Sequence, residues 1–350
     1  MNILYLINHA GQGGTEKYIR VLAEDMKKRG HTVFLVYNET GRLVAEVESL
    51  GIETIKLEMK SPFDSKASKT LKNICKEKKI DIIHTQFARE NYIAIRSKGA
   101  KVIHTSHIML RNDFAWKILN RMFMGRNKQI IALCELSKRI LIENKYPKNK
   151  ITVIPNGVVF KEDVEIAPIS DVFKFVTVTR FSEEKGIFFL LDAIKELKKK
   201  AQNFEVAFVG DGELLEEAKE YTKTNDIAEN TIFYGYREDV EDILKNSNCF
   251  INSSQSEVIS FAILEAMSVG LPIIATNVGG TPDIVNEKTN CGILADYGDV
   301  VAFSAGMYKI MNDVEFLREC ALNSQKAIKD IFNIENVLKK IYLTYEEGIK

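Results

Sequence analysis

The chain has few of the residues that mark secreted, membrane-spanning or zinc-binding proteins. Only five of its 350 residues are cysteines, and none of them forms a Cys-x-x-Cys pair. Scattered cysteines indicate buried thiols in a reducing compartment. No apolar run approaches about 18 residues, which argues against a membrane-spanning helix. Residues 3–7 form an apolar run without a charged leader or a cleavage site, and we therefore expect a strand and a cytoplasmic protein.

The chain also has no excess of charge of either sign. Lysine and arginine total 48, and so do aspartate and glutamate, which gives a formal net charge of zero. A neutral chain has no overall field that attracts nucleic acid, so any basic site must be local. We expect no nucleic-acid partner.

Apolar runs alternate with charged helical stretches from one end of the chain to the other. This pattern predicts βα units and parallel sheets. It lapses once, in the charged, proline-containing stretch 161–168, and then a second series of units begins. We therefore expect an α/β protein with two doubly wound, Rossmann-like domains, residues 1–163 and 164–333. They would face each other across a cleft at the carboxyl ends of their strands.

Residues 249–285 carry the chemistry that the chain is organised around. Seven residues separate Glu257 from Glu265, and a short helix is expected over residues 261–267, ending at Gly270. Backbone N–H groups at the helix start would face an anion, and the two carboxylates would accept hydrogen bonds from hydroxyls. A nucleotide sugar fits both. The alternative is that neither carboxylate binds a ligand: Glu257 would be an exposed charge on a loop, and Glu265 a capped or salt-bridged charge on the helix. The N–H groups in question belong to Val258, Ile259, Ser260 and Phe261.

This segment resembles the signature of the retaining glycosyltransferases of family 4. The matching elements are Glu257, Glu265-Ala266-Met267, Gly270-Leu271-Pro272 and Gly279-Gly280-Thr281-Pro282. The resemblance implies a GT-B fold, in which the second domain binds the donor, the first binds the acceptor, and the last helix, residues 334–350, crosses back to the first domain. One departure is Val258-Ile259-Ser260, where the family usually has Gly-Phe-Gly or Gly-Phe-Pro.

Arg180 and Lys185 lie in a loop directly after the first strand of the second domain. A planar guanidinium and an ammonium five residues apart can converge on one diphosphate, although a lone cation on a loop is usually solvated. The pair resembles the family's Arg-Phe-x-x-Glu-Lys-Gly element. The chain has no Asp-x-Asp motif that would hold a metal, so these cations and the helix start near Ser260 would meet the charge of the leaving group. We expect no metal and no cofactor.

Other site residues follow from the strand ends and from the resemblance. Gly13 and Gly14 open a helix and could cradle a phosphate, whereas Glu16 breaks the dinucleotide fingerprint. His104-x-x-His107 was weighed as a metal site but lacks helical metal-ligand spacing. The resemblance implies that His107 and Glu257 contact the donor sugar and that Glu265 binds the ribose. Gly210 and the pair Tyr236-Arg237 end two further strands, and the latter would lie beside the nucleobase.

The resemblance as a whole predicts a retaining, metal-independent hexosyltransferase. It would move a sugar, most simply from a UDP-sugar, to a hydroxyl of a glycan or lipid-linked acceptor in bacterial cell-surface polysaccharide or glycoconjugate synthesis. The alternatives are a nucleotide-sugar epimerase, an NAD-dependent dehydrogenase, which Glu16 disfavours, and a non-catalytic subunit that binds nucleotide sugars.

Residues 111–128 are relevant to whether the protein associates with a membrane. They hold the only tryptophan, Trp116, and are bracketed by basic residues. A basic amphipathic helix can lie on the anionic inner face of a membrane, although such helices more often pack onto a sheet.

Overall fold

The computed structural model describes residues 1–107, 113–162 and 171–349. The chain divides into two compact units, which we call the first unit (Met1–Asn156 with Glu335–Lys350) and the second unit (Gly157–Ile334). The predicted domain boundary between residues 163 and 164 falls at the edge of the stretch 163–170, which lies outside the described residues.

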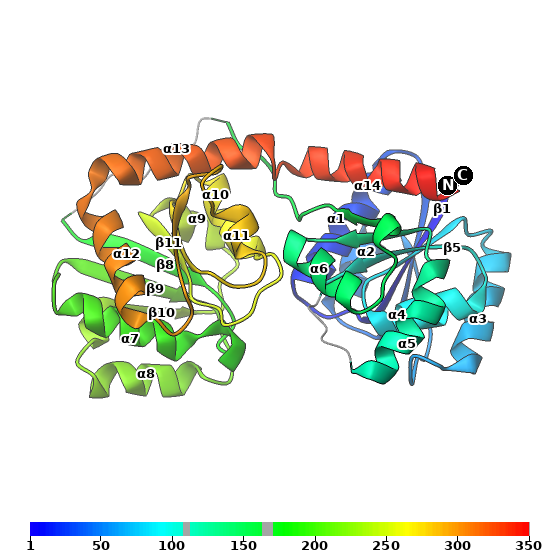
Figure 1. The fold of residues 1–350 in the computed structure, drawn as a ribbon, viewed down its shortest axis with the longest axis horizontal. Helices are drawn as coiled ribbons and strands as arrows, with labels where there is room; N and C mark the ends of the chain where they lie inside the picture. The colour runs from blue at the N-terminus through cyan, green and yellow to red at the C-terminus, as the bar shows by residue number, and fades with distance from the viewer. Residues whose placement is uncertain (108–112, 163–170, 350) are drawn as a thin grey trace. The chain divides into compact units, whose positions relative to one another are not determined.

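The first unit is built on a parallel sheet. Within the described residues its seven strands have the order β3-β2-β1-β4-β5-β6-β7, and helices cover both faces of the sheet (Figure 1). Residues 3–7 of the central strand β1 are fully buried, as expected for a strand covered on both faces. The strands are β1 (Asn2–His9), β2 (Thr32–Glu39), β3 (Glu53–Lys56), β4 (Ile82–Thr85), β5 (Lys101–Ser106), β6 (Gln129–Ala132) and β7 (Ile151–Val153). The helices are α1 (Gly14–Lys28), α2 (Arg42–Ser49), α3 (Ser65–Glu77), α4 (Ala88–Ser97), α5 (Phe114–Phe123), α6 (Glu135–Glu143) and α14 (Ile334–Ile349).

The second unit repeats this architecture. In the described part its six parallel strands have the order β10-β9-β8-β11-β12-β13. The strands are β8 (Phe173–Val178), β9 (Phe204–Val209), β10 (Thr231–Gly235), β11 (Cys249–Asn252), β12 (Ile273–Thr276) and β13 (Gly292–Ala295). The helices are α7 (Ile187–Lys198), α8 (Leu215–Thr224), α9 (Val240–Lys245), α10 (Phe261–Ser268), α11 (Thr281–Ile284), α12 (Val300–Asn312) and α13 (Val314–Asp330). Two α/β units with parallel sheets confirm the predicted fold class.

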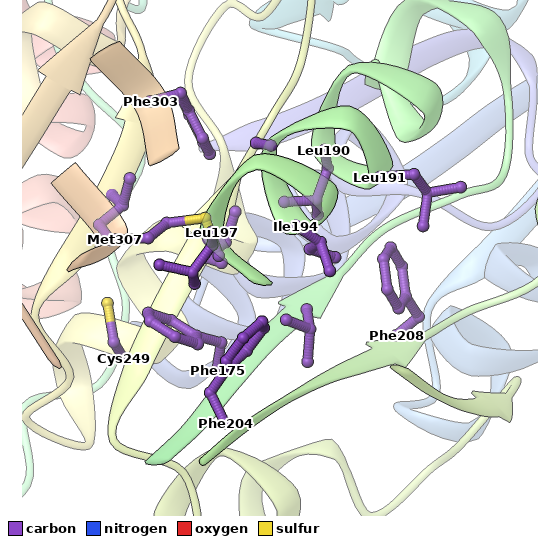
Figure 2. Packing of buried hydrophobic residues seen from close by; sticks show 14 of the residues in the cluster. Phe175, Leu190, Leu191, Ile194, Leu197, Phe204, Phe208, Cys249, Phe303 and Met307 are labelled. Atoms are coloured by element: carbon purple, nitrogen blue, oxygen red, sulfur yellow. The ribbon is translucent and has the colours of Figure 1, made fainter. Parts of the chain in front are cut away.

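The core of the second unit forms between α7 and its sheet. Leu190, Ile194 and Leu197 are spaced to share one face of α7, and all three are fully buried. Figure 2 shows them packed over aromatic side chains of the sheet, with two residues of α12 at one side. This packing holds the strands firmly, so the loops at their carboxyl ends start from fixed points. The aromatic side chains of the sheet are Phe175, Phe204 and Phe208, and the two residues of α12 are Phe303 and Met307.

The last helix, α14, belongs to the first unit, which confirms the predicted return of the chain. The Tyr345 hydroxyl lies 2.6 Å from Nδ1 of His84 and donates a hydrogen bond to the Tyr5 hydroxyl at 3.2 Å. All three side chains are fully buried, and burial lowers the pKa of His84 well below its usual value. The docking of α14 therefore includes a neutral polar network beneath the helix.

We expect Tyr345→Phe to destabilise the first unit by about 1–3 kcal/mol, because the substitution leaves buried polar partners without a hydrogen bond. Urea unfolding followed by the fluorescence of Trp116, the only tryptophan and a residue of the first unit, measures this directly. The control is Tyr342→Phe, on the less buried side of the same helix, where we expect a change within about 0.5 kcal/mol. Equal stability of the two variants would contradict the network's role.

Candidate functional site

The site residues predicted for the second unit lie at one edge of its sheet. They follow the carboxyl ends of β8, β9, β10 and β11, which are neighbours in the strand order. That order changes direction between β8 and β11. Open α/β sheets bind ligands outside the carboxyl ends of their strands at such a switch point. The sheet therefore gathers these loops where a ligand is expected.

Backbone contacts join the loop after β8 to the loop after β11. Gln255 N–H donates to the carbonyl of Glu184 at 2.8 Å, and Ser253 Oγ donates to the carbonyl of Lys185 at 3.0 Å. Gly186 has a φ of 62°, and a Cβ atom at this position would lie 2.1 Å from the Ser253 carbonyl oxygen. Only glycine allows so close an approach. The loops after β8 and β11 are therefore fixed against each other.

This approach brings together two predicted site residues, Lys185 and Glu257. Lys185 Nζ lies 2.7 Å from Glu257 Oε2, and the two side chains are only 23% and 16% exposed. Ser254 Oγ donates to the same carboxylate oxygen at 3.5 Å. A cation and a carboxylate, 72 residues apart in the sequence, therefore share one partly buried position.

Arg180 is more exposed than Lys185 and pairs with a different carboxylate. Its side chain is 69% exposed, and Nη2 lies 2.5 Å from Glu184 Oε1. Nε donates to Ser182 Oγ at 3.2 Å. Burial raises the pKa of Glu184, but hydrogen bonds from Arg180 and Ser182 lower it to about 2, so the carboxylate is charged. Among the described residues, Arg180 contacts this carboxylate and not Glu257, a partnership that the sequence analysis missed.

The loop before α10 does not need the glycines that the family usually has there. Val258, Ile259 and Ser260 are absent from the residues with positive φ, and Ser260 has a φ of −78°. Ser260 is the N-cap of α10, where its hydroxyl accepts a hydrogen bond from the N–H of Ile263 at 3.4 Å. Ile259 is buried, and Phe261, the first residue of α10, is half-buried. This departure from the family pattern is therefore compatible with an ordinary helix start.

The structure also locates Glu265 and Gly210. Glu265 is half-buried on α10. Gly210 has a φ of 137°, and a Cβ atom there would lie 1.8 Å from the carbonyl oxygen of Thr179. This glycine lets the loop after β9 pass against the loop that carries Arg180, which is a structural reason for its presence.

Exposed aromatic rings mark the end of β10. Tyr236 is 55% exposed and Tyr234 is 42% exposed. Arg237 forms a bidentate pair with Asp239, at 2.7 and 2.5 Å, and its guanidinium lies 5.9 Å from the centre of the Tyr234 ring. Neither Tyr234 nor Asp239 is among the site residues predicted from the sequence, because their contacts with Arg237 form only in the folded chain.

The first unit holds the remaining predicted residues. Gly13 is the N-cap of α1 and Gly14 its first residue, both exposed. The ring of Tyr18, on the same helix, meets the ring of His107 edge-on with centres 5.0 Å apart. Nε2 of His107 lies 2.9 Å from Oε1 of the buried Gln86. Burial, with a smaller contribution from His104, lowers the pKa of His107 to about 3, so the ring is neutral.

The described residues contain no group of three or more histidine, cysteine, aspartate or glutamate side chains that could hold a metal ion. His104 is fully enclosed, with Nδ1 3.0 Å from the Thr85 hydroxyl. The expectation of a metal-free site stays a prediction, to be tested in solution.

One helix of the first unit exposes an apolar face. Phe114, Ile118 and Met122 of α5 are 79%, 47% and 61% exposed, and their spacing of four residues places them on one side. The opposite side packs against the core through residues that include Trp116. The sequence is compatible with a helix packed onto the sheet and with one that lies on a membrane. In the structure one side of α5 is packed and the other is exposed, and contact with a membrane stays a prediction. Residues 111 and 112 of the predicted segment lie outside the described part of the chain.

Two family models match successive parts of the chain. The model described as Glycosyltransferase Family 4 matches residues 12–161, and the model described as Glycosyl transferases group 1 matches residues 159–327. The chain is also similar to an Escherichia coli UDP-Gal:alpha-D-GlcNAc-diphosphoundecaprenol alpha-1,3-galactosyltransferase. The two are 28% identical over 309 residues, which cover 79% of this chain and 78% of that protein.

Solved structures match almost the whole chain. A glycosyltransferase from Rickettsia africae has a TM-score of 0.88 and 22% identity, covering 100% of this chain and 98% of that one. Anabaena HepE in complex with UDP has a TM-score of 0.86 and 18% identity, covering 99% of this chain and 100% of that one. At these identities the likeness shows the fold alone.

Proposed function

This chain belongs to the glycosyltransferases of family 4, and we propose that it moves a sugar from a UDP-sugar to a hydroxyl of a glycan or lipid-linked acceptor. We further propose that it retains the anomeric configuration, uses no metal, and serves bacterial cell-surface polysaccharide or glycoconjugate synthesis. The observation that carries the proposal is the contact of Lys185 with Glu257 at the switch point of the second sheet. The contact sets a cation beside a carboxylate, and the proposal assigns the diphosphate of a nucleotide sugar to the cation and the sugar hydroxyls to the carboxylate.

Cleavage of the donor explains why cations are needed. The acceptor oxygen bonds to the anomeric carbon, the bond from that carbon to the β-phosphate oxygen breaks, and the diphosphate leaves with the electron pair. The acceptor proton passes to a phosphate oxygen on the same face. Lys185, Arg180 and the start of α10 would stabilise the growing negative charge, as preorganised donors do.

The ion pairs of the free protein suggest how the donor binds. Lys185 is paired with Glu257, and Arg180 with Glu184. In the donor complex each cation would turn to the diphosphate, while Glu257 would accept hydrogen bonds from sugar hydroxyls. After this exchange Glu257 still has hydrogen-bond donors at its partly buried position, where an unsatisfied charge would be costly, whereas the more exposed Glu184 is left to solvent.

A neutral His107 suits a contact with the sugar. Gln86 Nε2 donates to the carbonyl of His84 at 3.4 Å, which leaves Gln86 Oε1 to accept from His107. Nε2 of His107 must therefore carry the proton, and Nδ1 can accept a hydrogen bond from a hydroxyl.

We assign the donor base to uridine because the E. coli relative is named for UDP-Gal and HepE was solved with UDP. The exposed rings of Tyr234 and Tyr236 offer it a stacking surface.

We expect Arg180→Ala to lower the turnover of a UDP-sugar by about a hundredfold, because one preorganised donor to the leaving group is lost. The control is Arg318→Ala on α13, an exposed arginine whose loss should leave turnover unchanged. Release of UDP in the presence of EDTA measures both variants. Near-normal turnover of Arg180→Ala would refute the leaving-group role, and a wild type that binds UDP but releases none from any UDP-sugar would indicate a non-catalytic subunit.

We also propose that the protein is cytoplasmic and binds peripherally to the inner face of the membrane through α5. The support is the exposed apolar face formed by Phe114, Ile118 and Met122, flanked by Lys117 and Arg121. Apolar side chains with adjacent cations fit the interface of an anionic bilayer. No helix among the described residues is long and apolar enough to span a membrane.

Sedimentation with vesicles tests this surface. Each basic residue near an anionic surface contributes about 1 kcal/mol, so Lys117→Glu with Arg121→Glu should reduce binding to anionic vesicles by tenfold or more. The matched control, Lys69→Glu with Lys72→Glu on α3, changes the charge equally and should bind like wild type. Wild type that stays in the supernatant with anionic vesicles at low salt would rule the proposal out.

A further inference from the structure

Three polar side chains meet at the carboxyl edge of the first sheet, and the function proposed above does not use them. Asn8 Oδ1 accepts two hydrogen bonds, one from Asn38 Nδ2 and one from Arg89 Nη1, both at 3.0 Å. Asn8 lies near the end of β1, Asn38 near the end of β2, and Arg89 in the first turn of α4. All three are only half-buried, so a ligand can reach them.

The internal hydrogen bonds of this cluster occupy both lone pairs of Asn8 Oδ1 and one of the two on Asn38 Oδ1. Asn8 Oδ1 is shared by two donors, and Asn38 Oδ1 accepts from the N–H of Met59 at 3.0 Å. The groups left over around Asn8 itself are donors: the amide NH₂ of Asn8 and the remaining N–H groups of the Arg89 guanidinium. A surface that offers donors and a positive charge selects an anion.

Among the described residues no carboxylate lies within ion-pair distance of Arg89, although Arg89 lowers the pKa of the buried Glu90 beside it. In the described part of the chain Arg89 forms no ion pair, and its side-chain hydrogen bond goes to a neutral amide. Glu90 beside it is fully buried, with Oε1 accepting from the N–H of Asn8 and Oε2 without a partner. Burial raises the pKa of Glu90 to about 7, so much of it is neutral near that pH. The Glu39 carboxylate, which follows Asn38 on β2, lies 3.2 Å from Nδ1 of His9 rather than against Arg89.

The cluster of Asn8, Asn38 and Arg89 lies at the edge of the first sheet where a ligand is expected to bind. The order of the first sheet changes direction between β1 and β4, and Asn8 and Arg89 follow the carboxyl ends of these two strands. Phe87, two residues before Arg89, packs its ring 6.0 Å from the ring of His107. The cluster therefore shares an edge with the histidine assigned to the donor sugar.

We propose that Asn8 and Arg89 form an anion subsite that binds a phosphate group of the acceptor. This rests on the function proposed above, because it assigns to the first unit an acceptor that carries phosphate near the attacking hydroxyl. Asn38 positions Asn8 by holding its amide so that the NH₂ group faces outward. Glu90 positions the backbone of Asn8 without removing the positive charge.

Calorimetric titration of the full chain with inorganic pyrophosphate, in EDTA and saturating UDP, tests the subsite apart from the donor site. We expect wild type to bind and Arg89→Gln to bind about tenfold more weakly or worse, as the loss of a charge-assisted hydrogen bond implies. Asn8→Asp, which keeps the shape but adds a negative charge, should also weaken binding tenfold or more. Lys69→Gln on α3 removes the same charge as Arg89→Gln and should match wild type within twofold.

Three results would overturn the subsite: no binding by wild type under saturating UDP, equal binding by Arg89→Gln, or an equal loss in Lys69→Gln. Urea unfolding of each variant separates lost binding from lost folding. UDP-sugar hydrolysis by wild type separates the two proposals. If wild type hydrolyses a UDP-sugar but Arg89→Gln binds pyrophosphate as well as wild type does, the subsite alone is refuted. If pyrophosphate binding depends on Arg89 but wild type hydrolyses no UDP-sugar, the subsite is supported and the proposed transfer is refuted.

Discussion

The site of the second unit depends on the close contact between the loops that follow β8 and β11. Gly186 permits the backbone of one loop to touch the other at Ser253, and this contact sets Lys185 against Glu257. A partly buried cation or carboxylate left alone would be costly, so each compensates the other in the free protein. A ligand that carries both phosphate and hydroxyl groups can replace both partners at once. A phosphate alone would leave Glu257 with only the 3.5 Å hydrogen bond from Ser254, which favours a nucleotide sugar over a simple nucleotide.

The two units contribute different kinds of chemistry. The second unit offers cations, a helix start and exposed aromatic rings along four adjacent strand ends. The first unit offers a neutral histidine whose proton is fixed by Gln86, and a donor-rich cluster around Asn8. The charged pairs Lys185–Glu257 and Arg180–Glu184 lie in the second unit, whereas the contacts of His107 in the first unit are with neutral side chains. The exposed face of α5 adds a third surface, which suits an acceptor held at a membrane.

Much of the framework followed from the sequence because it depends on local patterns. The predicted helix over residues 261–267 forms as α10 (Phe261–Ser268), and Gly270 has the positive φ expected just beyond a helix end. The partners of Arg180, Gln86 and Arg89 did not follow, because they depend on side chains that meet only after the strands are ordered in a sheet. The two faces of α5 were likewise ambiguous, since the sequence shows an amphipathic pattern but not which apolar residues the core covers.

The most direct test of the account is the difference in affinity between UDP and uridine, measured by calorimetry in EDTA. Two charge-assisted contacts to the diphosphate imply that UDP binds at least about a hundredfold more tightly than uridine without any divalent metal. Equal affinities, or tight binding of UDP only after metal is added, would contradict the claim that Lys185, Arg180 and the start of α10 hold the diphosphate.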